Sequence, residues 1–356
     1  MRLTLPMLMA GLAVAASAAA QDGDQRIVLR DMVRVVSSEV PRAAVASELK
    51  ARAYQGRARG PEQTERFSRK VKFGRDGRVS VANISGDIVV TGGSGDEVSI
   101  EAVKRTRGSQ SELASVRIDV DERPGRVDVQ TTHTGRNDHV SVDYTVVVPA
   151  SASVDLHSVS GAVKVTGVRG SVRAETVSGN VTTTDTPKLE SARSVSGNVL
   201  LTAAAADGDL SAGTVSGNLT AKGMKVHGLD LGSVSGDISL SDVMCDRLGI
   251  KSVSGSVEYA GSIAKSGRYD INTHSGTVRL VLVNPSGFEL NATSFSGSIR
   301  SDLPLTIGGD SARRARDAGR RRDTGVNSHR MRATFGDGSA TLILRTFSGD
   351  IVIAKQ

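Results

Sequence analysis

The side chains that could most readily do chemistry in this 356-residue chain are serines, because a serine precedes a glycine in ten copies of one short motif. The copy at Ser194 to Val199 reads SVSGNV. A serine nucleophile needs one base and one orienting acid, and no histidine recurs in step with these serines. The nucleophile-elbow pattern G-x-S-x-G is also absent. We therefore predict that the repeated serine is structural.

Histidines and the single cysteine are the next candidates for chemistry. Among six scattered histidines, His133 and His139 lie near each other, beside Asp138, in a polar stretch that favours a solvated loop over a metal site. His274 replaces an inward apolar residue of the repeat, which favours a partly exposed or hydrogen-bonded structural histidine and leaves a buried functional base as the alternative. Cys245, the only cysteine, excludes an internal disulfide, and nearby acids favour an inert, partly buried thiol. We predict no metal and no cofactor.

Paired carboxylates would indicate a polysaccharide hydrolase or lyase. The position after each repeat glycine carries no two neighbouring acids in the continuous run of repeats. It carries Asn180, Asn198 and Asn218 in succession, which predicts an amide ladder between stacked coils. A solenoid enzyme that acts on acidic polysaccharide, with its site in longer loops, remains the alternative to a protein without catalytic activity.

Arginines supply the one binding site that the sequence nominates. Residues 313–322 hold six arginines and one aspartate, net +5. Guanidinium groups bind phosphates and carboxylates in a bidentate manner. We predict an anion-binding loop, with a merely solvated charged loop as the alternative; its arginines are Arg313, Arg314, Arg316, Arg320, Arg321 and Arg322. Residues 42–72 are also basic, net +6, while the rest of the mature chain is net acidic, which argues against a nucleic-acid-binding surface.

The spacing of the motif predicts the elements that position these residues. From the second to the ninth glycine the intervals are 18, 18, 20, 19, 19, 21 and 21 residues. A repeat of this length that recurs in succession is typical of a solenoid. The ten repeat glycines are Gly86, Gly161, Gly179, Gly197, Gly217, Gly236, Gly255, Gly276, Gly297 and Gly349.

Each repeat predicts one coil of two short strands and two turns, stacked in register on its neighbours at about 4.8 Å. Glycine is expected at the bend because positive φ, or crowding by adjacent coils, tolerates no Cβ. Apolar residues recur two positions before the glycine, as at Val195, and two positions after it, as at Val199. Both columns are expected to form the inner wall. The predicted fold class is all-β, a β-solenoid with a period of about 18–21 residues.

Several stretches of the chain, the repeats among them, carry a resemblance to a known family. They are Gly77 to Ile88, Thr91 to Val98, Val142 to Pro149, the V-S-G-N/D repeats, and the ending Phe335 to Ile351. Over about residues 70–356 the chain resembles the bacterial family of unknown function called "putative adhesin" or toast-rack domains. The resemblance implies a β-solenoid in an envelope or secreted protein, and it brings no catalytic residues.

The chain divides into three expected parts. Residues 1–20 have the charged, apolar and small-residue zones of a secretory signal peptide, which predicts export to the periplasm, the cell surface or the medium. Residues 21–70 form a basic segment, expected to be helical, a cap or disordered. Residues 71–356 form the solenoid domain with a mobile loop at about 308–330.

We predict an exported, non-enzymatic, adhesin-like scaffold. Its expected partner is an envelope component, either an acidic glycan, a lipid headgroup or a protein, and no nucleic acid. An envelope-stress or signalling component is a further alternative. No transmembrane segment is expected in the mature chain.

Overall fold

The computed structural model describes residues 62–307 and 329–355, apart from positions 75, 136–138, 204 and 286, and all of these belong to one compact unit that spans Ala46–Gln356. The described residues are almost entirely β-structure, which confirms the predicted fold class. The strands are β1 (Gln63–Lys72), β2 (Arg78–Ser85), β3 (Ile88–Gly93), β4 (Glu97–Thr106), β5 (Val116–Arg123), β6 (Arg126–His133), β7 (Ser141–Pro149), β8 (Ser153–Ser160), β9 (Val163–Thr166), β10 (Ser171–Ser178), β11 (Val181–Thr184), β12 (Lys188–Ser196), β13 (Val199–Thr202), β14 (Ala205–Ser216), β15 (Leu219–Ser235), β16 (Ile238–Ser254), β17 (Val257–Gly261), β18 (Arg268–Ser275), β19 (Val278–Leu282), β20 (Phe288–Ser296), β21 (Ile299–Ser301), β22 (Thr306–Ile307), β23 (His329–Phe335), β24 (Ala340–Ser348) and β25 (Ile351–Lys355). One short helix, α4, spans Gln110–Ala114.

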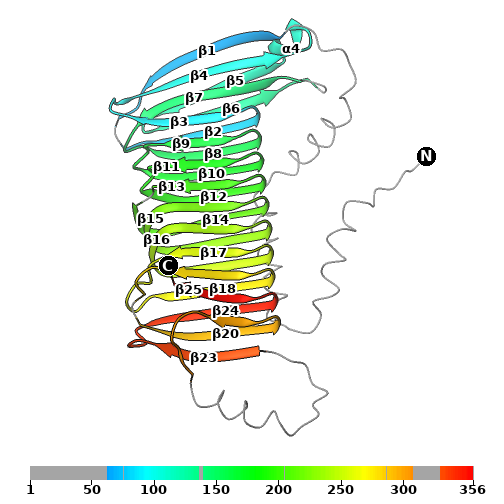
Figure 1. Cartoon of the computed structure of the whole chain (residues 1–356). Helices are drawn as coiled ribbons and strands as arrows, with labels where there is room; N and C mark the ends of the chain where they lie inside the picture. The colour runs from blue at the N-terminus through cyan, green and yellow to red at the C-terminus, as the bar shows by residue number, and fades with distance from the viewer. Residues whose placement is uncertain are drawn as a thin grey trace, which may run out of the picture. The chain divides into compact units, whose positions relative to one another are not determined.

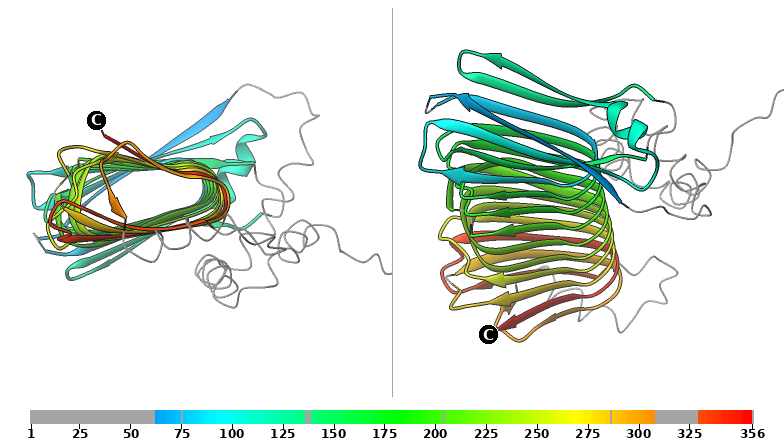
Figure 2. Two further views of the ribbon diagram at one scale, coloured as in Figure 1. Left: turned by 60° about the horizontal axis from the view of Figure 1, so that its bottom comes forward. Right: turned by 90° about the horizontal axis from the view of Figure 1, so that it is seen from above.

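The strands stack as parallel coils (Figure 1). In each coil one strand leads into the repeat glycine and a second strand leaves it. We call the sheet of leading strands the pre-bend face, the sheet of leaving strands the post-bend face, and the row of bends that joins them the bend edge. Viewed along the stack, the coils form a flattened closed outline (Figure 2, left). The long strands β15 and β16 continue around the opposite side, the far edge, without a break.

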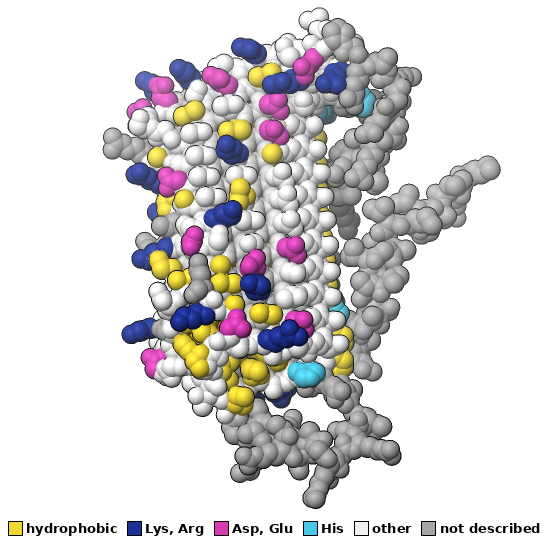
Figure 3. Space-filling view, viewed as in Figure 1, with side chains coloured by type: hydrophobic (Ala, Val, Ile, Leu, Met, Phe, Trp, Pro, Cys, Tyr) yellow, Lys and Arg dark blue, Asp and Glu magenta, His cyan; other side chains and the backbone are white. Residues whose placement is uncertain are grey.

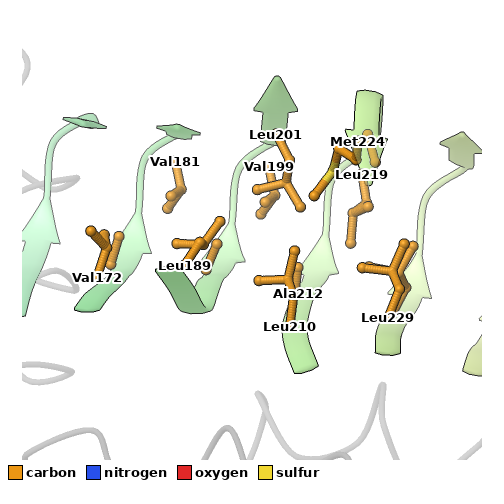
Figure 4. Close-up of a cluster of buried hydrophobic side chains, with 14 of the residues drawn as sticks. Val172, Val181, Leu189, Val199, Leu201, Leu210, Ala212, Leu219, Met224 and Leu229 are labelled. Atoms are coloured by element: carbon orange, nitrogen blue, oxygen red, sulfur yellow. The ribbon is translucent and has the colours of Figure 1, made fainter. Parts of the chain in front are cut away.

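The core fills the flattened space between the two faces. Side chains from the pre-bend face, such as Val172, Leu189 and Leu210, point toward side chains from the post-bend face, such as Val181 and Val199 (Figure 4). All five are at most 2% exposed. Alternation along each strand places these β-branched and leucine side chains inward and polar ones outward, so each coil buries its apolar face only against its neighbours.

The middle coils follow one another in chain order. Strand β8 pairs with β10, β10 with β12, and β12 with β14, all parallel, with one register shift between β10 and β12 after Val172. On the post-bend face β9, β11 and β13 pair in the same way. This sequential stacking continues through β18 and β19.

Both ends of the stack depart from chain order. At the C-terminal end the coil β24/β25 lies between β18/β19 and β20/β21, although it comes last in the chain. At the N-terminal end β2/β3 lies between β6/β7 and β8/β9. Gly276 and Gly297, expected on adjacent coils, are therefore separated by the coil of Gly349.

Antiparallel strands cover the two ends. Strands β4 and β1 extend the N-terminal end on one face and β5 on the other, while β23 covers β20 at the C-terminal end. The outermost strand β1 reads QTERFSRKVK, and such charged side chains discourage edge-to-edge association. Residues 63–70, expected in the basic segment before the solenoid, form part of β1 at this end of the stack. The rest of that segment, up to residue 61, lies outside the described residues.

Candidate functional site: the bend edge

The ten repeat glycines form one column along the bend edge. Their φ angles lie between +111° and +158°. A Cβ on Gly217 would overlap the carbonyl oxygen of Gly197, and the same relation holds for each neighbouring pair, including Gly349 above Gly276 and Gly297 above Gly349. Positive φ and backbone overlap thus both demand glycine at this position.

A buried hydroxyl column lies three positions before the glycines. Thr214 Oγ1 donates to the carbonyl of Gly197 at 2.9 Å, and Ser194 Oγ donates to that of Gly179 at 2.8 Å. The carbonyl that crowds the next glycine is thereby hydrogen-bonded inside the stack. Sequence reasoning missed this column, although Ser or Thr occupies the position in nine of the ten repeats and Asn83 in the first.

In several coils the Asn or Asp after the glycine forms a ladder, but its partner is the backbone and not the side chain that the predicted amide ladder needs. Asn198 N–H donates to Asn180 Oδ1, and Asn218 N–H donates to Asn198 Oδ1, both at 2.8 Å. Asp237 and Asp350 act in the same way toward Ser256 and Ser298. Each of these side chains therefore binds the backbone of the next coil. An amide ladder would instead require hydrogen bonds between side chains.

The apolar column two positions before the glycines faces outward, which corrects the predicted inner wall. Strand alternation places the hydroxyl column inward, so its neighbours, such as Val195 and Val215, are partly exposed. The bend interrupts this alternation of inward and outward side chains. The column two positions after the glycine is therefore buried, as at Val199 and Leu219. The outward column runs, in order along the stack, through Ile84, Val159, Val177, Val195, Val215, Val234, Val253, His274, Phe347 and Phe295.

The column ends in three stacked rings. His274 lies 4.9 Å from Phe347 between ring centroids, with planes 10° apart, and Phe347 lies 4.6 Å from Phe295, with planes 7° apart. Phe347 and Phe295 are 40% and 39% exposed. His274 is partly exposed, as the favoured interpretation expected, because the whole column to which it belongs faces outward. Apolar side chains also gather over the C-terminal coils on the face that Figure 3 shows.

The other candidates for chemistry are the arginines, a metal site and the thiol of Cys245. Arg313, Arg314, Arg316, Arg320, Arg321 and Arg322 lie outside the described residues. No group of three His, Cys, Asp or Glu residues in the described part of the chain could hold a metal ion. Burial raises the pKa of the Cys245 thiol to about 12, with Asp246 adding to the shift, so the thiol is protonated and unreactive at neutral pH.

The pre-bend face carries a cluster of paired charges. Arg173 binds Glu190 at 2.7 Å, and His157 contacts Asp155 at 3.0 Å. The hydrogen bond from His157 holds the pKa of Asp155 below its ordinary value, so this carboxyl stays ionised. A glycosidase acid needs the opposite shift, so this cluster does not match that chemistry.

The family resemblance is confirmed in the C-terminal part of the chain. Residues 191–354 match the sequence profile of Toastrack DUF4097, a domain of unknown function. No curated protein matches the chain significantly. Among the described residues, no helix has the length and apolar character needed to cross a membrane.

Three solved structures are similar over most of the chain. A "putative adhesin" from Bacteroides fragilis is 11% identical, with a TM-score of 0.41, over 81% of this chain and 97% of that one. A "putative adhesin" from Parabacteroides distasonis is 12% identical (TM-score 0.25, 82% and 97%), and a "putative cell adhesion protein" from Clostridium sporogenes is 7% identical (TM-score 0.24, 83% and 100%). At these TM-scores the similarities carry no argument about this chain.

Proposed function

We propose that this protein, whose residues 191–354 match the Toastrack DUF4097 profile, is an exported, non-enzymatic, adhesin-like scaffold. It uses its bend edge to bind an anionic component of the cell envelope. The observation that carries the proposal is the outward apolar column. Ten in-register coils each present one partly exposed side chain on the same line. Side chains in such a line are held at the strand spacing of about 4.8 Å, which suits an extended partner.

The rigidity of the stack supports a scaffold role. The bends are held by backbone hydrogen bonds and, in several coils, also by a ladder rung or a buried hydroxyl. A surface whose side chains are already ordered loses little conformational entropy on binding. The bend edge therefore offers a preorganised contact surface.

The six arginines of residues 313–322 are the proposed anion contact. The described residues that flank them both belong to the C-terminal end: Ile307 pairs with Ala333 and His329 pairs with Ser294. Both described residues that flank this segment therefore lie at the end of the stack that carries the aromatic rings. The charge of the arginines would favour an acidic glycan, a lipid headgroup or an acidic protein surface.

Export is tested by expressing the full chain in a bacterium and separating cytoplasm, periplasm, membranes and medium. The expected product outside the cytoplasm has lost residues 1–20, and intact mass and N-terminal sequencing give the cleavage site. A chain that stays in the cytoplasm with Met1 to Ala20 attached would contradict the proposal.

Binding is tested by replacing all six arginines with serine in the mature chain. The parent should be retained on anionic lipid vesicles or on a sulfated polysaccharide column, and retention should fall steeply with salt, because the Debye length is only about 8 Å at physiological ionic strength. The variant should lose most retention on the responsive probe at an unchanged melting temperature. Unchanged retention would refute the arginine contact, and turnover of an acidic glycan that a single Asp or Glu substitution abolishes would refute the non-enzymatic assignment.

A further inference from the structure

The C-terminal corner of the bend edge combines exposed aromatic rings with cations. His274, Phe347 and Phe295 become neighbours only because β24 lies between β18 and β20. Arg345 precedes Phe347 by two residues on the same strand, so both side chains leave β24 on the same side. We call His274, Phe295, Phe347 and the cations described next the aromatic corner.

Two more cations lie beside the rings. Arg330 is directly opposite Thr293, which precedes Phe295 by two residues on β20. Lys251 pairs with Asn272, which precedes His274 by two residues. Within the described part of the chain, no ion pair involves Lys251, Arg330 or Arg345. Their charges are therefore available to an anionic partner.

The ring geometry decides which partner fits. The centroid separations of 4.6 and 4.9 Å match the strand spacing, and the planes are nearly parallel, so the rings stack along the solenoid axis with their edges outward. Both faces of Phe347 are covered by its two neighbours. Stacking of a sugar or a nucleic-acid base needs an open ring face, which Phe347 lacks, whereas the outward ring edges suit contact with hydrocarbon.

We propose that the aromatic corner docks on a bilayer that contains anionic lipid, with the rings entering the boundary between headgroups and acyl chains and the cations meeting the lipid phosphates. This inference rests on the proposed binding function and specifies its partner as a lipid surface. A projecting edge can meet a flat bilayer without a pocket. Aromatic side chains prefer the membrane interface, and each Lys or Arg near an anionic surface adds attraction.

The first test places a fluorescent reporter at the corner. The chain contains no tryptophan, so Phe295→Trp supplies the only indole. On vesicles of phosphatidylglycerol and phosphatidylcholine its emission should shift to the blue and be quenched by brominated acyl chains. Met244→Trp is the matched control, because Met244 is 51% exposed but lies on the far edge, midway between two bends. Vesicle binding without any change in Phe295→Trp emission would overturn the proposal.

The second test compares matched substitutions by vesicle sedimentation. Phe295→Ser with Phe347→Ser should lower vesicle affinity by about tenfold or more, in proportion to the apolar area lost. Arg330→Ser with Arg345→Ser should lower it by about fivefold per cation on anionic vesicles. The control pair Lys164→Ser with Lys222→Ser removes the same charge from the exposed post-bend face and should have a much smaller effect.

These outcomes separate this inference from the proposed function. If the phenylalanine variants keep full vesicle affinity, the aromatic corner is not a membrane contact, whatever the arginine variants do. If the protein binds only the sulfated polysaccharide column and no vesicle, the lipid partner is wrong while an anion-binding scaffold stands. Melting temperatures of all variants show whether the outward substitutions leave the fold intact.

Discussion

The middle coils and the C-terminal coils use the same motif but differ in how the chain reaches its neighbours. From β8 to β19 each coil stacks on the one before it in the sequence, whereas β24/β25 enters between two coils that the sequence makes consecutive. Gly297 and Gly349 are both compatible with stacking on Gly276, because all three coils carry the same bend. An identical bend therefore specifies that coils stack, and it does not specify their order.

The largest expected effect is the formation of an engineered disulfide, which tests the stacking order of the C-terminal coils. In a Cys245→Ser background, Arg268→Cys with Thr341→Cys should crosslink fully, because these exposed positions are in-register partners on β18 and β24. Arg268→Cys with Glu289→Cys should not, since the intervening strand places them about 9.6 Å apart, beyond the usual range for disulfides of about 4.4–6.8 Å between Cα atoms. Mass spectrometry after mild oxidation gives both yields. The reverse result would mean that the coils stack in chain order.

A valine at a repeat glycine should give the largest loss of stability. Gly217→Val combines a positive φ with overlap of the Gly197 carbonyl, and should cost about 4 kcal/mol or more in the free energy of unfolding. Gly125→Ala isolates the backbone effect, because φ is +71° there and a Cβ would meet nothing within 4 Å; it should cost about 1 kcal/mol.

The effect of a valine should also depend on whether the glycine lies in the middle of the stack or in its last coil. Gly297→Val disturbs the last coil and the β24/β25 coil whose Gly349 carbonyl it would overlap, so hydrogen exchange should accelerate in β20 to β25 while β10 to β15 stay protected. Gly217→Val should expose coils on both sides, because stability in a stack depends on nearest neighbours. Equal loss of protection throughout the molecule in both variants would show that the solenoid unfolds as a single unit.

Much of the middle, and little of the ends, could be predicted from the sequence. The period, the glycines and the column at Val199 follow from local patterns that repeat in chain order. The outward direction of the column at Val195 was missed because the bend interrupts strand alternation, so the two flanking columns do not share a phase. The insertion of β24/β25 and the aromatic corner that it creates depend on long-range pairing, which the motif leaves open.

Removal of a buried hydroxyl should have a smaller effect on stability, and the effect should differ between the middle coils and the inserted coil β24/β25. Thr214→Val removes the donor to the Gly197 carbonyl and should cost about 1–2 kcal/mol. Thr346 occupies the same position in the inserted coil, but its buried Oγ1 has no partner among the described residues, so Thr346→Val should be neutral or slightly stabilising. Ser216, which is exposed, provides the matched control, and Ser216→Ala should change stability by less than about 0.5 kcal/mol. Chemical denaturation of the three variants measures the differences, and a costly Thr346→Val would show that this hydroxyl has a partner.

The smallest expected effect concerns the ladder rungs. The middle coils use the amides of Asn180, Asn198 and Asn218 and one carboxylate, Asp237, whereas the last rung is the carboxylate of Asp350. Asp350 Oδ1 accepts the Ser298 N–H at 2.7 Å and the Ser298 hydroxyl at 2.9 Å. These bonds, the backbone one above all, hold the pKa of Asp350 below its ordinary value of 3.8. A carboxyl whose folded-state pKa is depressed stabilises the fold fully above its unfolded-state pKa, and loses that contribution as the pH falls through the folded-state value.

Acid should therefore loosen the rung between β25 and β21 while the asparagine rungs of the middle coils stay closed. Carboxylate NMR should show Asp350 titrating below pH 3.8, and the Ser298 amide should exchange faster as Asp350 takes up its proton. Asp350→Asn turns the end rung into one of the middle type and should remove this pH dependence without moving the Asn218 amide. If Asp350 titrates at or above its ordinary value, the carboxylate does not hold the last coil, and the end of the stack is fixed by its strand pairing and glycine column alone.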